Sequence, residues 1–305
     1  MNFSTELSAI VGQENFTENM PLSRLCTFGT GGSADLYITP PDLPALLQVL
    51  DWLKANEIPF FLLGRGSNIL ASDEGYRGAV VSLKKHLNKI CIYQNTLVAE
   101  AGAMLQDTAR AAQIAGLSGL EFASGIPGTV GGGLFMNAGA YGGELKDVVR
   151  LATVIFEDGS VEEMTAKEME LSYRHSVFSE KPRIILSVEM ELENGDPAKI
   201  LEKTEELNAR RREKQPLEYP SAGSTFKRPE GHYAGALIEE AGLKGFSFGG
   251  ACVSEKHAGF VINKGNATSS DIFTLTELIR EKVFENSGVK LEREIRLLGD
   301  FKKEQ

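Results

Sequence analysis

Residues 125–141, GIPGTVGGGLFMNAGAY, constrain the fold of this chain more than any other stretch. Six of these seventeen positions are glycine, and glycine loses more backbone entropy on folding than any other residue. An ordinary helix or strand is therefore not expected here, whereas tight turns or a close approach of backbone to a ligand are. Val130 and Leu134 favour burial, and Pro127 stiffens the segment. We predict a rigid, half-buried loop whose bare N–H groups suit an anionic ligand such as a pyrophosphate.

Two further glycine clusters precede this segment. One, Gly-Arg-Gly-Ser-Asn at 64–68, follows the apolar run 58–63, and the other occupies 27–32. Neither a G-x-G-x-x-G fingerprint nor a G-K-[ST] motif is present, which argues against a Rossmann dinucleotide site and a P-loop. Each cluster taken alone is equally consistent with a structural turn. Three clusters in the N-terminal half favour a phosphate-bearing cofactor.

Composition excludes several classes of function. The 305 residues carry a formal net charge of −10, which disfavours nucleic-acid binding. No run of apolar residues is long enough for a membrane span, and the N-terminal residues lack the pattern of a signal peptide. Cys26, Cys91 and Cys252 are far apart and show no metal-ligand spacing, so we predict small buried thiols, no metal, and a reducing cytoplasmic compartment.

The hydrophobic pattern predicts short helices and strands in alternation, typical of an α+β fold. Helices are expected at 42–56, 104–115, 198–214, 233–241 and 269–287, with the last capped by Ser or Thr and closed near Gly288. Strands are expected at 58–63, 79–83, 148–156, 183–192, 259–263 and 293–298, with two more in 89–100 and a hairpin turn at 157–160. The break at 194–197 predicts a domain junction.

Eight motifs, in order along the chain, are similar to those of the UDP-N-acetylenolpyruvoylglucosamine reductase family, flavoenzymes of peptidoglycan synthesis. They are FGTGGSAD at 28–35, LLGRGSNIL at 62–70, GIPGTVGG at 125–132, MNAGAYG at 136–142, YRHSVF at 173–178, AGSTFKRP at 222–229, LIEEAGLKG at 237–245 and LEREIRLLG at 291–299. The resemblance covers nearly the whole chain, from about residue 19 to 299. At this length the chain resembles the shorter of two subtypes, so no substrate-capping tyrosine is carried over.

The resemblance implies a two-part FAD-binding region of the vanillyl-alcohol-oxidase type and a C-terminal α+β substrate-binding domain. The expected bounds are 1–85 and 86–197 for the two FAD-binding subdomains and 198–305 for the substrate domain, leaving open whether the last strand packs on the first subdomain. FAD is expected to bind non-covalently. The implied cofactor-binding residues are Gly29, Gly31, Gly64, Arg65, Gly66, Ser67, Asn68, Gly125, Ile126, Pro127, Gly128, Thr129, Asn137, Ala138, Gly139, Ala140 and Tyr141.

The resemblance also implies the reaction. NADPH is the expected reductant, hydride passes through the flavin to the β-carbon of the enolpyruvyl group, and the product is UDP-N-acetylmuramate. Ser224 matches the family's proton donor to the α-carbon, Glu294 its catalytic carboxylate and Arg174 its catalytic arginine. From the residues alone, a turn-forming role is the favoured interpretation of Ser224, and only the motif match reverses it. Glu292–Arg296 contacts could be a surface charge ladder, and Arg174 a salt-bridge partner.

Basic residues would have to offset the acidic net charge at an anionic substrate site. Lys214, Arg228 and His257 are the expected substrate-binding residues, although the family commonly has another polar residue at position 228 and a lone histidine is often structural. Arg65, Arg174 and Lys227 complete a possible cluster of cations. The expected partner is the small-molecule substrate, with no nucleic acid and no membrane span, and the chain is expected to be a monomer.

Two other functions are compatible with the same motifs. A flavin oxidase on this scaffold would use oxygen, and such enzymes often attach the flavin through His or Cys. Neither residue type occurs within the three glycine clusters, which disfavours covalent attachment. A silent FAD- or nucleotide-binding module would not need Ser224, Glu294 and Arg174 together.

Overall fold

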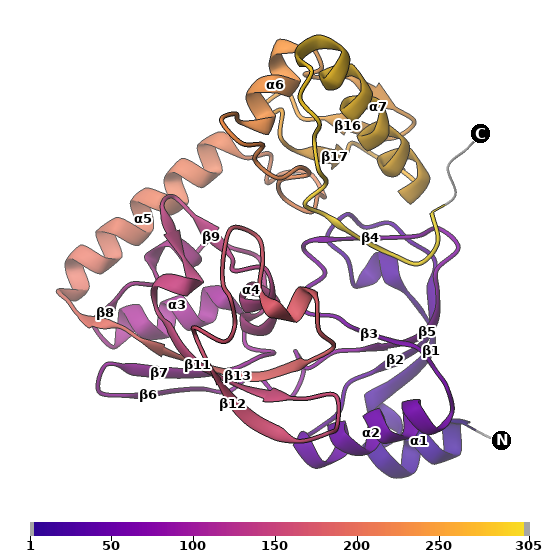
Figure 1. Cartoon of the computed structure of the whole chain (residues 1–305), viewed down its shortest axis with the longest axis vertical. Coiled ribbons are helices and arrows are strands. Elements are labelled where there is room, and N and C mark those ends of the chain that lie inside the picture. Colours follow the sequence, from indigo (N-terminus) through magenta and orange to yellow (C-terminus); the bar gives the residue numbers. More distant parts are fainter. Residues whose placement is uncertain (1–2, 302–305) are drawn as a thin grey trace. The chain divides into compact units, whose positions relative to one another are not determined.

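The structure is a computed structural model that describes residues 3–301. It has an α+β fold and divides into two compact units. Unit 1 comprises Met1–Thr17, Tyr37–Arg65 and Ala79–Arg211, and unit 2 comprises Glu18–Leu36, Gly66–Gly78 and Arg212–Gln305. The chain therefore contributes several separate segments to each unit (Figure 1).

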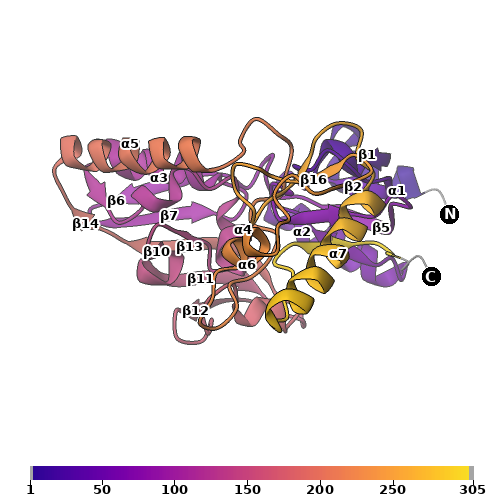
Figure 2. The same cartoon turned by 90° about the horizontal axis from the view of Figure 1, so that it is seen from above.

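Unit 1 contains a five-stranded antiparallel sheet (Figures 1 and 2). Its strand order is β12 (Val161–Thr165), β11 (Val149–Ile155), β13 (Ile184–Glu191), β7 (Thr96–Glu100) and β6 (Ile90–Tyr93). Helix α4 (Val130–Phe135) contacts β13 and β7 and also α3 (Leu105–Ile114). The glycine-rich segment is thus packed against the sheet of this unit. The long helix α5 (Pro197–Lys214) follows the sheet in the chain (Figure 2).

Two helices at the N-terminal side of unit 1 pack on each other, α1 (Phe3–Val11) and α2 (Leu43–Ala55) (Figure 1). Asp42 caps α2 because its side chain accepts a hydrogen bond from the N–H of Ala45 at 2.8 Å. The indole of Trp52 donates to Glu6 at 2.6 Å, which joins the two helices. The helix predicted at 42–56 is thereby held against α1.

A four-stranded sheet has the order β1 (Phe16–Pro21), β2 (Ser33–Ile38), β5 (Tyr76–Val81) and β3 (Phe60–Leu62). Strand β3 pairs parallel to β5, with Phe61 opposite Val80. Short strand pairs are β8 (Leu117–Ser118) with β14 (Glu193–Asn194) and β9 (Gly139–Ala140) with β10 (Gly143–Glu144). Single 3₁₀ turns occupy Gln13–Asn15, Leu22–Arg24, Glu121–Ala123, Leu145–Asp147 and Val177–Ser179.

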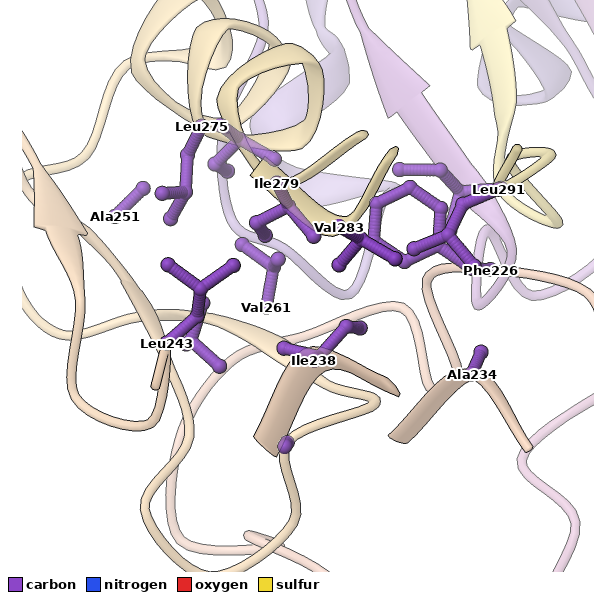
Figure 3. Close-up of a cluster of buried hydrophobic side chains, with 14 of the residues drawn as sticks. Phe226, Ala234, Ile238, Leu243, Ala251, Val261, Leu275, Ile279, Val283 and Leu291 are labelled. Carbon is purple, nitrogen blue, oxygen red and sulfur yellow. The ribbon is translucent and has the colours of Figure 1, made fainter. Parts of the chain in front are cut away.

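Unit 2 packs α6 (Ala234–Glu240) and α7 (Ser269–Ser287) with a small antiparallel sheet of β15 (Ser247–Phe248), β16 (Ala251–Val253) and β17 (Val261–Asn263). Leu275, Ile279 and Val283 of α7 point into a cluster of buried hydrophobic side chains (Figure 3). Ile238 of α6 and Val261 of β17 belong to the same cluster. Thr268 caps the start of α7, and Gly288 ends it in the left-handed conformation at φ 71°.

One more strand pair ties distant parts of unit 2 together. Strand β18 (Arg296–Leu298) runs parallel to β4 (Ile69–Ala71), with Leu297 opposite Leu70. Leu70 and Phe28 are fully buried in the same cluster as the α7 side chains. The core of unit 2 is therefore built from residues that precede and residues that follow the long unit 1 segment Ala79–Arg211.

Most of the predicted elements are confirmed. Helices α2, α3, α5, α6 and α7, strands β3, β5, β6, β7, β11, β13 and β17, and the hairpin turn at 157–160 lie where they were expected, within a few residues at each end. The predicted strand at 293–298 is shorter, because only a single bridge at Arg293 precedes β18. Helix α1 and strands β1, β2 and β12 were not predicted.

Two predictions are wrong. The glycine-rich segment does contain a helix, α4, since Thr129 caps it and two of its three glycines, Gly131 and Gly133, let its backbone approach its neighbours. A Cβ on Gly131 would lie 2.8 Å from Ala101, and one on Gly133 would lie 2.8 Å from Leu105. Tertiary packing thus overrides the low helix propensity of glycine. Cys91 is exposed rather than buried, because it lies on the outward face of the edge strand β6, whereas Cys26 and Cys252 are buried.

Candidate active site

The turn at 64–68 has the geometry of an anion cradle. Gly66 adopts φ 70°, its carbonyl accepts a hydrogen bond from the N–H of Thr27 at 3.1 Å, and any Cβ there would overlap the Leu25 carbonyl. Within residues 3–301, the backbone N–H groups of Arg65, Gly66 and Ser67 donate no hydrogen bond. Backbone N–H groups that remain available in one turn attract a phosphate group. This turn therefore fits the pyrophosphate of a dinucleotide.

The glycine-rich segment lies beside the start of that turn within unit 1. A Cβ on Gly64 would lie 2.6 Å from Oγ1 of Thr129, the residue whose side chain caps α4. Only glycine at 64 allows this approach. The two motifs are thus in contact through Gly64 and Thr129.

Asn137 is fully buried, and its side chain is hydrogen-bonded to other residues of the chain. Its Nδ2 donates to Glu144 at 2.7 Å and to the Ser172 carbonyl at 2.9 Å, while its Oδ1 accepts from the N–H of Lys146. The hydrogen bond from Lys146, followed by that from Asn137, lowers the pKa of Glu144. Any contact of Asn137 with a cofactor would therefore come from its backbone.

The turn that carries Arg174 is fastened to the same glycine-rich segment. Ser172 and His175 pair through their backbones, and Arg174 adopts φ 54°, which is unusual for a residue with a side chain. Ser176 donates to the Phe135 carbonyl at 2.6 Å, and Arg174 Nη2 donates to the Gly139 carbonyl at 3.3 Å. These contacts hold the guanidinium next to the backbone of Gly139.

In unit 2, Ser224 and Glu294 lie on two neighbouring extended segments. Glu294 N–H donates to the Thr225 carbonyl at 2.8 Å, and Phe226 and Arg293 form an antiparallel bridge. Phe226 is a buried member of the core cluster and is drawn with it in Figure 3. The core thereby fixes the segment that carries Ser224 beside the one that carries Glu294.

The Ser224 hydroxyl is available. Ser224 is half-buried and follows Gly223, which has φ 75°. Its Oγ makes no hydrogen bond to any residue in the described part of the chain. The turn hydrogen bond that would explain this serine structurally is therefore not formed, and the hydroxyl can meet a ligand.

The expected substrate-binding residues have different surroundings. Lys214 is exposed at the end of α5, and Arg228 is exposed with its guanidinium 4.7 Å from the ring centroid of Tyr233. His257 Nδ1 accepts from the N–H of Gly259 at 3.1 Å, and burial lowers the pKa of His257. All three belong to unit 2.

The cluster of five cations expected from the sequence stays a prediction. Lys227 forms an ion pair with Glu292 at 2.5 Å, so its charge is already compensated. Arg65 and Arg174 belong to unit 1, and the other cations belong to unit 2.

Arg211 on α5 was missed by the sequence reasoning. Its Cδ lies 2.9 Å from where a Cβ of Gly125 would be, and burial lowers the pKa of its guanidinium. Among residues 3–301, its guanidinium makes no hydrogen bond or ion pair. A half-buried cation without a counter-charge in the described residues, beside the glycine-rich segment, is a candidate contact for an anion. Helical spacing alone gave no signal, because Arg210, Arg211 and Arg212 are consecutive.

Comparison with known proteins decides the family. The C-terminal domain of UDP-N-acetylenolpyruvoylglucosamine reductase matches residues 215–298, and an FAD binding domain matches 34–165. The chain is 48% identical to a UDP-N-acetylenolpyruvoylglucosamine reductase of Caldanaerobacter subterraneus, over 97% of each chain. It belongs to the UDP-N-acetylenolpyruvoylglucosamine reductase family.

Other members of the reductase family agree. The reductase of Clostridium perfringens is 46% identical over 98% of each chain. The crystal structure of the reductase from Thermus caldophilus superimposes with a TM-score of 0.81 at 34% identity, covering 92% of this chain and 98% of that one. As a member of the reductase family, this chain is an FAD-binding oxidoreductase of peptidoglycan synthesis. None of the helices in residues 3–301 has the length and apolar composition needed to cross a bilayer.

Proposed function

We propose that this chain reduces UDP-N-acetylenolpyruvoylglucosamine to UDP-N-acetylmuramate, with NADPH as the reductant. The relatives carry that substrate in their name, and the observation that carries the proposal is the Ser224–Glu294 arrangement. The Ser224 hydroxyl makes no hydrogen bond within residues 3–301, and it lies one residue from Thr225, whose carbonyl accepts the Glu294 N–H. A silent FAD-binding module has no need for this arrangement.

The cofactor residues named from the sequence remain the proposed FAD contacts, with Arg211 added and with Asn68 contributing only through its backbone, because its side chain is bonded to Glu294. They are supported by the N–H groups of residues 65–67, which donate to no acceptor in residues 3–301, and by the half-buried Arg211 beside Gly125. Bound FAD would carry hydride from NADPH to the β-carbon of the enolpyruvyl group. The protein residues must then bind, orient and protonate the substrate.

Three residues are proposed to serve the reaction. Arg174 would bind the substrate carboxylate, since a guanidinium stabilises charge that spreads into it. Ser224 would deliver the proton to the α-carbon. Glu294 would polarise the enol system or relay that proton.

The remaining contacts follow the charge of the substrate. Lys214 and Arg228 are proposed to bind its diphosphate, because both are exposed cations of unit 2. His257 is proposed as a neutral polar contact, since burial lowers its pKa and its Nδ1 already accepts a hydrogen bond.

We also propose the domain bounds 1–85, 86–197 and 198–305, a monomeric chain and a cytoplasmic location. The three cysteines are unpaired, which supports a reducing compartment. Sedimentation of the purified protein tests the oligomeric state.

An anaerobic visible spectrum tests the function. Flavin bands should bleach when NADPH is added and return when UDP-N-acetylenolpyruvoylglucosamine is added. Bands that return only with oxygen would indicate an oxidase. A protein that stays colourless after incubation with FAD would overturn the flavin chemistry altogether.

A further inference from the structure

Asn68 lies in the glycine turn named as a pyrophosphate cradle, yet its side chain faces another part of unit 2. Its Nδ2 donates a hydrogen bond of 3.1 Å to the backbone carbonyl of Glu294, 226 residues away in the chain. The Asn68 carbonyl accepts from the N–H of Arg296 at 2.9 Å. The residue thus contacts the segment of the proposed catalytic carboxylate twice.

These contacts complete a clamp on the backbone of Glu294. On one side, the Glu294 N–H donates to the Thr225 carbonyl at 2.8 Å. On the other side, its carbonyl accepts the Asn68 amide. The parallel pairing of β4 with β18 begins at Ile69, one residue after Asn68, and at Arg296, two residues after Glu294. Both peptide groups that flank the Glu294 Cα are therefore fixed.

We propose that Asn68 is a positioning residue for Glu294, and that its amide holds the catalytic carboxylate in register with the cofactor turn. This inference rests on the proposed function. An amide that is engaged with a carbonyl of the protein has less capacity to bind the pyrophosphate, so the cofactor contacts of this turn come from its backbone N–H groups. Removing the amide should loosen Glu294 while FAD still binds.

The test is the pair of half-reactions of the FAD-loaded Asn68→Ala enzyme. FAD affinity and the rate of flavin reduction by NADPH should stay within about twofold of the parent enzyme. Reoxidation by UDP-N-acetylenolpyruvoylglucosamine should slow by about 10- to 100-fold, because small displacements of a catalytic group cost rates of that order. The side chain of Asn68→Ser is too short for its hydroxyl to reach the same carbonyl, so this variant should show the same slowing. It replaces the alanine variant in the test if that variant does not fold.

A double-mutant cycle separates positioning from a general loss of structure. In a Glu294→Gln background, adding Asn68→Ala should produce little further slowing, because the group that Asn68 positions is already gone. Asn56→Ala is the matched control, since its Nδ2 makes the same kind of bond to the Trp52 carbonyl at 2.9 Å. That variant should lower the unfolding midpoint and leave both half-reactions unchanged.

Three results would overturn the inference: weaker FAD binding with normal reoxidation once the enzyme is saturated, equal slowing of both half-reactions, or full additivity with Glu294→Gln. The first would make Asn68 a cofactor ligand. Failure of the proposed function is distinguishable, because the parent enzyme itself would then not be reoxidised by the substrate.

Discussion

Ser224 has what a proton donor requires at the level of a single residue. Its hydroxyl is half-buried and meets no acceptor in residues 3–301, and the adjacent Thr225 is locked by bonds to Gly259 and Val261. A serine is a weak acid, so such a group needs a fixed position and stabilising neighbours to transfer a proton. The surrounding backbone supplies the fixed position.

Replacing Ser224 by alanine should therefore slow one half-reaction only. Reoxidation of the flavin by substrate is expected to fall by about 10²- to 10⁴-fold, the range for loss of general acid catalysis, while reduction by NADPH is unchanged. Stopped-flow absorbance of each half-reaction measures this. A uniform loss in both, or no loss in either, would contradict the role of Ser224.

Arg211 makes a second prediction at the residue scale. Arg211→Gln should weaken FAD binding by about 10- to 100-fold, because a hydrogen bond to a charged group contributes about 1.5–3 kcal/mol. The exposed Arg212, the next residue on α5, provides the control as Arg212→Gln. Titration of the apoprotein with FAD measures both affinities, and equal affinities would exclude Arg211 as a cofactor contact.

His257 links pH to stability. Burial lowers its pKa in the folded state from the usual value of 6.5, so the unfolded chain binds the proton more readily. Stability therefore falls as the pH drops through about 6.5. His257→Asn should show a smaller loss than the parent between about pH 8 and about pH 5 in urea unfolding. His86, whose pKa is also lowered by burial, is present in both proteins. Identical pH profiles would refute this assignment.

At the scale of elements, α4 shows why glycine can be a helix residue. The six-residue helix VGGGLF is capped by Thr129 and lies against α3 and the sheet. Gly131 faces Ala101 and Gly133 faces Leu105 at distances that leave no space for a methyl group, whereas Gly132 is exposed. The glycines therefore serve the packing of the helix rather than its flexibility.

Gly131→Ala should accordingly destabilise unit 1. The expected loss is roughly 1–3 kcal/mol of unfolding free energy, as for overpacked sites, since the added methyl meets Ala101. Gly132→Ala is the matched control, because its Cβ would meet only Thr129 Oγ1, at 3.2 Å. Urea unfolding of the two variants compares them, and equal losses would show that packing against Ala101 is not the cause.

At the scale of the whole molecule, the two compact units do not follow the order of the chain. Unit 2 combines the C-terminal part of the chain, from Arg212 on, with the earlier segments 18–36 and 66–78. Phe28 and Leu70 are fully buried in its main core cluster, and β4 is the partner of β18. The C-terminal region is therefore only part of a core.

Expressed alone, residues 212–305 should not fold cooperatively. The fragment lacks Phe28, Leu70 and the strand β4, and it would leave β18 unpaired with apolar surface exposed. We expect no sigmoidal transition in urea followed by circular dichroism, in contrast to the full chain. A cooperative transition of the fragment would show that its own residues suffice for the core.

The sequence by itself determined the family, the cofactor class and most elements, because these depend on local signals. Asp42, Thr268 and Gly288 mark helix ends that the structure confirms, and the ordered motifs identified an FAD-dependent reductase. Tertiary structure alone decided how side chains are used. Asn68 bonds to Glu294 across 226 residues, and Lys227 pairs with Glu292 across 65. Burial and partners of this kind arise only when distant segments meet, so no local pattern encodes them.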